Sequence, residues 1–282
     1  MSHTHTTSVA PAPALSPATV ALSSAAKSII ALLHSSTASP EWLFYLNARD
    51  PSALKTAAPS VSAFLKGRKE ALERYLAEDE VNQIRVSEKT RAFWSEKKDT
   101  TEGLLTTLDE ADKSDADLSE SGKKAHEEYF KKTKAMWEVG LAQVLTQLSK
   151  EVVGPFALGA PRHATSSCSS LIRSVLRVGE QISVVDMHLA AWLHELVILS
   201  GGNAQESGAV AIARLEGHIG GGFVFAKDAV PAVPASTAVP RATHSEGIVP
   251  TPSTTGPKPK LAVVWDALTE RPSWQKVFGV KG

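Results

Sequence analysis

Apolar residues recur along this chain at helical spacing, and no pair of segments alternates in the manner of paired strands. Between residues 122 and 150 they stand at steps of seven, four, three and four: Phe130, Trp137, Leu141, Val144 and Leu148. A similar spacing from residue 60 to 76 predicts a helix supported by the pair Glu70 and Arg74. Further helices are predicted at 19–36, 81–108, 207–218 and 260–270, with a short one ending at Phe278. The pattern predicts an all-α helical bundle.

The most apolar predicted helix follows Ser183. Because Ser183 and Asp186 are three residues apart, the hydroxyl can accept from the N–H of Asp186 while the carboxylate accepts from the N–H of Ser183. The carboxylate also meets the positive end of the helix dipole. The residues that follow are apolar almost all round: Val185, Met187, Leu189, Ala190, Trp192, Leu193, Leu196 and Val197. We therefore expect a structural capping box opening a buried helix, rather than a catalytic serine and acid.

Two flanking runs add to the capping box. Residues 151–159 read E-V-V-G-P-F-A-L-G, and residues 261–274 read L-A-V-V-W-D-A-L-T-E-R-P-S-W. The three motifs, in this order, resemble the C-terminal helical domain of glutathione S-transferases, in particular the fungal type. The resemblance implies a helical bundle in which an apolar ligand lies against a long helix. It makes Phe93 and Trp94 candidate substrate-binding residues.

The N-terminal thioredoxin-like domain of that family, which activates the glutathione thiol, has no counterpart in the pattern of this sequence. The resemblance therefore implies a binding or interaction module that is non-catalytic alone, with no cofactor. The alternative is a glutathione transferase shortened by truncation or by a gene-structure error, which conjugates glutathione to apolar electrophiles. Glutathione would then bind only if an N-terminal domain were supplied.

Composition divides the chain further. The expected parts are a disordered tail at 1–18, an N-terminal extension with a short helix at 19–59, a helical core at 60–226, a Pro/Ala/Ser/Thr-rich linker at 227–259, and C-terminal helices at 260–282 that return to the core. Members of that family join the first motif to the capping box through only a few residues. The connection is longer in this chain, because residues 161–180 are added. An ordered insertion, a loop and a splicing error in the gene structure all remain open for this stretch.

Charge and cysteine content limit the kinds of partner and the cellular compartment that we expect for this protein. Lys plus Arg and Asp plus Glu both number 30, so the formal net charge is zero, which argues against nucleic acid and anionic membranes. The single cysteine, Cys168, fits a reducing compartment, and no early apolar run is long enough to span a bilayer. We expect a cytoplasmic protein whose partner is an apolar small molecule or a protein, with a homodimer as a further option.

Other candidate chemistry fails on spacing. His194-Glu195 begins a zinc-protease motif, but position 198 holds Ile198 instead of the second histidine. His188 and His194 are six residues apart, so they point about 120° apart on a helix and cannot share a metal. Cys168 has no neighbouring base to lower its pKa. The sequence therefore predicts no catalytic residue and no metal ligand.

Overall fold

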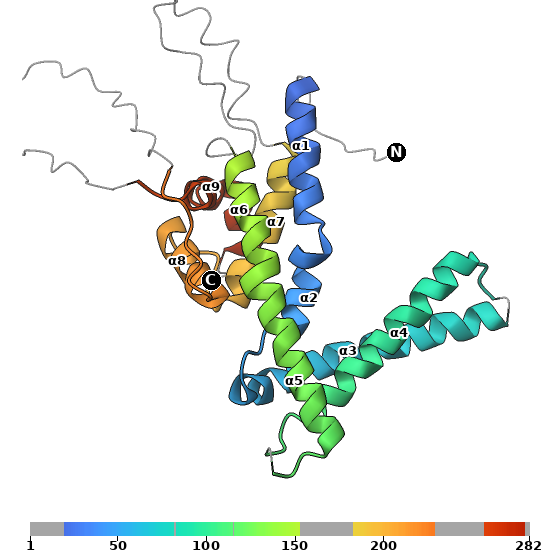
Figure 1. The fold of residues 1–282 in the computed structure, drawn as a ribbon. Coiled ribbons are helices and arrows are strands. Elements are labelled where there is room, and N and C mark those ends of the chain that lie inside the picture. The colour runs from blue at the N-terminus through green and yellow to red at the C-terminus, as the bar shows by residue number, and fades with distance from the viewer. Residues whose placement is uncertain (1–19, 82, 115, 153–182, 229–256, 280–282) are drawn as a thin grey trace, which may run out of the picture. The chain divides into compact units, whose positions relative to one another are not determined.

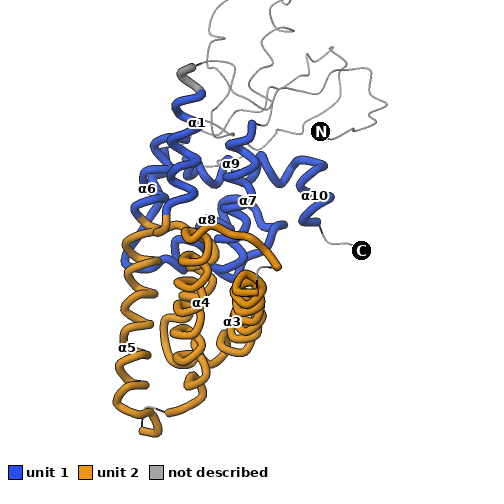
Figure 2. Tube along the Cα trace, turned by 90° about the vertical axis from the view of Figure 1, so that its right-hand side faces the viewer, with its two compact units in different colours: residues 1–35, 143–282 blue, residues 36–142 orange. Residues whose placement is uncertain are grey.

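The computed structural model describes residues 20–81, 83–114, 116–152, 183–228 and 257–279, and these form helices and turns without a β-strand. The predicted all-α class is confirmed. The chain divides into two compact units, residues 36–142 and residues 1–35 with 143–282 (Figure 2). The expected core boundaries at 60 and 226 do not coincide with this division. The reason is that one continuous helical run crosses residue 142, and its periodicity does not reveal where its packing partners change.

The unit of residues 36–142 is built around a long helical hairpin. Its elements are η1 (Ser36–Ala38), α2 (Pro40–Tyr45), α3 (Pro51–Glu80), α4 (Glu88–Leu108), α5 (Glu120–Lys134) and the π-helical η2 (Ala135–Leu141). Helices α3 and α4 lie side by side over most of their length (Figure 1). Helix α5 continues directly into η2, and the run then continues as α6 (Ala142–Glu151).

Local signals fix where these helices begin. Asp50 accepts from the N–H of Ala53 at 2.8 Å, and Pro51 occupies the first turn, where its missing N–H is not needed. Helix α3 therefore begins at Pro51 instead of residue 60 and contains Pro59 in its interior. Helix α4 begins at Glu88 instead of residue 81, because Ser87 caps it through the N–H of Thr90.

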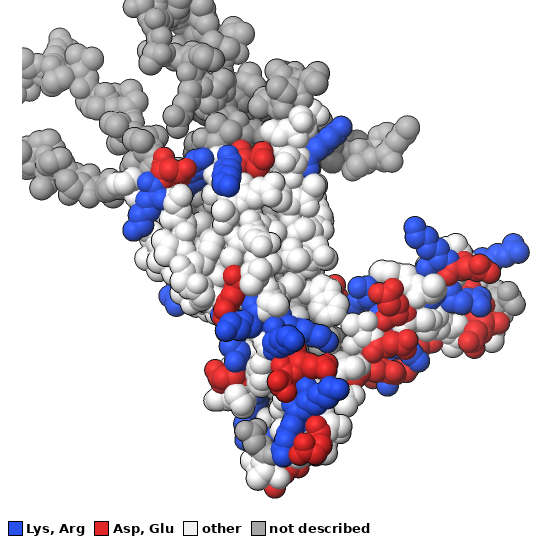
Figure 3. Space-filling view, viewed as in Figure 1, with Lys and Arg blue, Asp and Glu red and all other residues white. Residues whose placement is uncertain are grey.

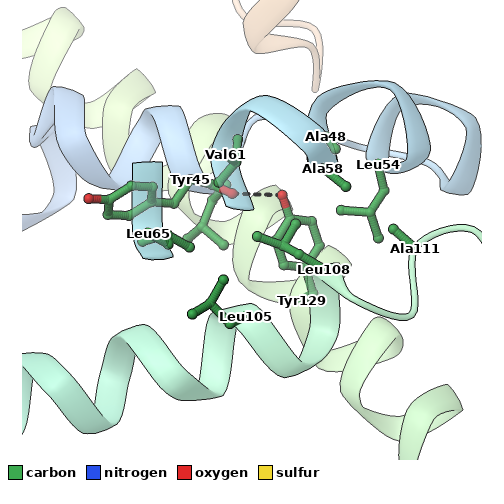
Figure 4. Close-up of a cluster of buried hydrophobic side chains, with 11 residues drawn as sticks. Tyr45, Ala48, Leu54, Ala58, Val61, Leu65, Leu105, Leu108, Ala111 and Tyr129 are labelled. Atoms are coloured by element: carbon green, nitrogen blue, oxygen red, sulfur yellow. Dashed lines mark hydrogen bonds between the residues drawn. The ribbon is translucent and has the colours of Figure 1, made fainter. Parts of the chain in front are cut away.

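The core of this unit gathers apolar side chains from α2, α3, α4 and α5 (Figure 4). Its buried members are Tyr45, Leu46, Ala48, Leu54, Ala58, Val61, Leu65, Leu105, Leu108, Ala111 and Tyr129. The Tyr129 hydroxyl donates to the carbonyl of Tyr45 at 2.7 Å, and the Trp137 indole donates to that of Leu46 at 2.8 Å. These two donors satisfy carbonyls at the C-terminal end of α2, where the last carbonyls of any helix have no partner within it.

The other unit contains α1 (Val20–Leu33), most of α6, α7 (Val184–Leu199), α8 (Gly208–Ile219), α9 (Lys260–Thr269) and α10 (Pro272–Phe278). Helix α1 packs on α7, and α8 packs on both α7 and α9. Ser207 makes no side-chain cap on α8; instead the Gly208 N–H donates to Asp266 Oδ1 of α9 at 2.6 Å. The start of α8 thus depends on a residue far along the chain.

Helix α7, which the sequence predicts as a buried helix, has one buried face and one exposed face. Leu189, Leu193 and Leu196 are fully buried, but Met187 and Ile198 are 45% and 43% exposed. An apolar composition allows a helix to be buried. The number of helices that pack against it decides how many of its faces are buried. The expected tail at 1–18, most of the linker at 227–259, most of the run at 151–159 and the stretch at 161–180 lie outside the described residues.

Candidate functional site

A small cavity opens on the unit of residues 36–142, between α2, α3 and α4. The hollow measures about 220 Å³ when the adjoining open solvent is counted, but the enclosed space is only about 10 Å³. Its lining residues are Glu41, Trp42, Tyr45, Arg68, Lys97, Thr100, Thr101 and Leu104. That enclosed space holds about one water molecule, so a larger ligand would lie across the opening and not inside it.

A hydrogen-bonded triad forms one wall of the cavity. Arg68 Nη1 pairs with Glu41 Oε1 and donates to the Tyr45 hydroxyl at 2.8 Å, and that hydroxyl donates to Glu41 Oε1 at 3.0 Å. Burial raises the pKa of Tyr45 to about 12 and lowers the pKa of Arg68 from its ordinary value. Tyr45 is therefore neutral at physiological pH, and its one proton is already committed to a carboxylate.

Lys97 forms the opposite wall, between two aromatic rings. Its Nζ lies 5.8 Å from the centroid of Trp42 and 5.4 Å from that of Phe93, both within the range of cation–π attraction. Among the residues that the structure describes, no carboxylate forms an ion pair with Lys97. The cavity thus holds the cations of Arg68 and Lys97 against the single carboxylate of Glu41.

The structure separates the two residues predicted to bind substrate. Phe93 is 52% exposed and contacts Lys97 at the edge of the cavity. Trp94 lies against Tyr75 of α3, with ring centroids 5.4 Å apart. Neither residue lines the cavity itself. Adjacent helical positions point about 100° apart, so one pocket does not take both side chains.

The capping box is present at Ser183 and Asp186. The Ser183 N–H donates to Asp186 Oδ2 at 2.8 Å, and the Asp186 N–H donates to Ser183 Oγ at 3.4 Å. The Ser183 hydroxyl itself donates to the same carboxylate at 2.6 Å. Asp186 is only 3% exposed, so its carboxylate is occupied by capping and has a structural role.

The sequence did not predict that the last two helices, α9 and α10, bind the turn between α7 and α8. Trp265 donates its indole N–H to Glu206 O at 2.8 Å, and Trp274 donates to Ala204 O at 3.2 Å. Both carbonyls lie in the turn between α7 and α8, next to the Gly208 N–H that Asp266 accepts from. The available sequence signal was the pair of tryptophans in Trp265-Asp266 and Ser273-Trp274. The sequence does not show which turn these two side chains pack against, so their hydrogen-bond partners could not be predicted.

The described ranges contain neither a cluster of three metal-binding side chains nor a membrane-spanning helix. Within them, no group of three or more His, Cys, Asp or Glu side chains is arranged to hold a metal ion. No described helix combines the length and apolar character needed to cross a membrane. Cys168 and the Gly154–Phe156 part of the first family motif lie outside these ranges.

Comparison with known proteins identifies no relative. No protein-family model, no curated protein and no solved structure matches this chain.

Proposed function

We propose that this chain is a helical binding module of the kind that forms the C-terminal half of glutathione S-transferases. The support is the reciprocal capping box of Ser183 and Asp186 at the start of α7, together with the tryptophan-bearing closing helices. Because a fold does not fix a function, the proposal of binding rests on the cavity and not on the resemblance.

The ligand that we propose for this opening is a small molecule with one aromatic or apolar part and one anionic group, which would lie across its mouth. The observation that carries this proposal is the pairing of two cations, Arg68 and Lys97, with the ring of Trp42 around one opening. An anion near Lys97 Nζ would gain a charge-assisted hydrogen bond. A flat apolar group would cover Trp42 and Leu104.

Benzoate is the probe we would use, with benzamide as its neutral isostere. Saturation transfer from the full chain to benzoate should be strong, and transfer to benzamide much weaker. In Lys97→Gln the benzoate affinity should fall about tenfold or more, since a hydrogen bond to a charged group contributes about 1.5–3 kcal/mol. The matched control is Lys66→Gln, which removes a cation from the same unit that pairs with Asp109 and does not line the cavity.

Two results would contradict the proposal: equal transfer to benzoate and benzamide, or an unchanged benzoate affinity in Lys97→Gln. Glutathione conjugation, the alternative implied by the resemblance, is tested on the same chain with glutathione and an aryl halide. We expect no rate above that of the buffer, because the Tyr45 proton is donated to Glu41 and is not available to a thiolate. Conjugation that is lost in Tyr45→Phe would favour the alternative.

A further inference from the structure

Two histidines far apart in the sequence meet on the surface of the unit that contains α1 and α7. His34 follows the last residue of α1, and His188 lies in the second turn of α7. His34 Nε2 and His188 Nδ1 are 3.3 Å apart, with ring centroids 5.3 Å apart and planes inclined by 70°. Both residues are exposed to solvent. Sequence spacing compared His188 with His194, whereas the structure pairs it with a residue 154 positions away.

We propose that His34 and His188 together bind a divalent transition metal ion, with Zn²⁺ the best fit. Two imidazole nitrogens that bind one tetrahedral Zn²⁺ at about 2.0–2.1 Å stand about 3.3–3.4 Å apart. The observed separation matches that value. The same 3.3 Å separation is also within reach of a hydrogen bond between the two rings when no ion is present. The two nitrogens are therefore already placed at the separation that a shared ion requires, and Zn²⁺ would replace the proton between them.

The backbone of both ligands is held before any ion arrives. Leu33, next to His34, is 4% exposed, and Leu189, next to His188, is fully buried. His188 also follows the capping residue Asp186 by two positions, next to a helix start that the reciprocal capping box holds in place. Binding therefore needs only side-chain rotation, which loses little conformational entropy.

The chemistry of the pair defines the class of ion. Imidazole nitrogens suit Zn²⁺, Co²⁺, Ni²⁺ and Cu²⁺, whereas Ca²⁺ and Mg²⁺ require oxygen ligands. No third His, Cys, Asp or Glu among the described residues joins the pair. Water then completes the coordination, and the ion cross-links the end of α1 to α7. We expect a site of modest affinity that exchanges its metal, distinct from a structural zinc core.

The test is titration of the full chain with Zn²⁺ at neutral pH by calorimetry. His34→Gln and His188→Gln should each lose one equivalent of bound Zn²⁺, and the double variant should lose no more than either single one. The matched control is His5→Gln, which removes a histidine outside the pair and should leave this equivalent in place. Circular dichroism checks that each exposed substitution leaves the helix content unchanged.

Co²⁺ gives an independent readout. Wild type should show visible absorption bands of a tetrahedral Co²⁺ ion, and Zn²⁺ should displace them. Both single variants should lose those bands. The proposal is overturned if wild type binds no more Zn²⁺ than the double variant, which would leave only a hydrogen-bonded pair. Retention of the site in either single variant would also overturn it, because one histidine would then suffice.

Discussion

In the unit of residues 36–142, Tyr129 and Trp137 donate to two successive backbone carbonyls, those of Tyr45 and Leu46, where α2 ends. Each donor comes from the α5–η2 helix, far along the chain from the acceptor. The surrounding surface is highly charged, and in Figure 3 the Lys, Arg, Asp and Glu side chains gather over α3, α4 and α5.

In the other unit, Trp265 and Trp274 donate to Glu206 and Ala204 in the α7–α8 turn. Both units use the same kind of contact: an aromatic ring packs in the apolar core while its polar atom donates to a backbone carbonyl at the end of a helix or in a turn. The surroundings differ, because His194 stacks on Phe278 with centroids 4.0 Å apart and Trp274 packs beside both. Beside Trp137 of the first unit, by contrast, the guanidinium carbon of Arg49 lies 5.5 Å from the ring centroid.

The difference bears on stability within the first unit. Beyond Leu72, the described part of α3 buries only Asp79, and the facing part of α4 buries nothing before Thr101. This end of the hairpin is held by the ring contact of Tyr75 with Trp94 and by the ion pair of Arg91 with Asp79. Exposed ion pairs contribute about 0–1 kcal/mol each, so charge pairing stabilises an element much less than apolar burial does.

The largest expected effects come from removing one aromatic donor in each unit. Trp137→Ala and Trp265→Ala should each lower the free energy of unfolding by about 3–5 kcal/mol, since both rings are fully buried. Hydrogen exchange should rise first within residues 36–142 for Trp137→Ala, and within 183–228 and 257–279 for Trp265→Ala. Equal exchange throughout the chain for both variants would mean that the two units unfold as one.

A pair of glycines compares close packing with open surface. A Cβ on Gly208 would lie 2.0 Å from the backbone oxygen of Ala262, so Gly208→Ala must push α8 and α9 apart. Overpacking of this kind lowers stability by about 1–3 kcal/mol. The control is Gly67→Ala in α3, where nothing lies within 4 Å and stability should rise by about 0.5–1 kcal/mol. Chemical denaturation measures both, and a stable Gly208→Ala would contradict the close approach.

Capping separates a buried helix start from an exposed one. Asp186→Ala should lower the free energy of unfolding by about 1–3 kcal/mol, because backbone donors at the start of α7 lose a buried partner. Ser183→Ala should lower it somewhat less. The matched control is Ser87→Ala at the exposed start of α4, with about 0.5–1 kcal/mol. An unchanged denaturation midpoint for Asp186→Ala would weaken the resemblance as well.

The smallest effect concerns alkaline pH and one unit alone, since the chain's three tyrosines, Tyr45, Tyr75 and Tyr129, all lie in residues 36–142. Burial raises the pKa of Tyr129 to about 12 from 10.0. The unfolded phenol loses its proton near pH 10 while the folded one keeps it. Its contribution to stability is therefore fully present below pH 10 and is lost as the pH rises through 12.

Tyr129→Phe should reduce the fall in stability between pH 10 and 12, measured by denaturation at each pH. At neutral pH it should be less stable by about 1 kcal/mol, because the carbonyl of Tyr45 loses its donor. Tyr75→Phe is the control, since Tyr75 is 39% exposed and should leave the pH dependence nearly unchanged. An identical alkaline profile in Tyr129→Phe and wild type would contradict the assignment.

The sequence by itself determined the helical class and most helix starts. A hydroxyl or carboxylate three residues before a backbone N–H reaches it whatever surrounds the helix, so the box of Ser183 and Asp186 could be predicted from spacing. The expected pair of Glu70 and Arg74 failed, because Arg74 lies 3.8 Å from Glu78 instead. Exposed side chains choose among several partners of nearly equal energy.

Only the tertiary structure decided which residues meet across the chain. Lys97 beside Trp42, Asp266 at the start of α8, and His34 beside His188 each join positions that no helical period connects. Periodicity specifies the face that a helix buries. It does not specify the neighbour, because any other helix with an apolar face could cover it. The choice of neighbour depends on shape and on backbone groups left unsatisfied at turns, and these exist only once the helices have packed.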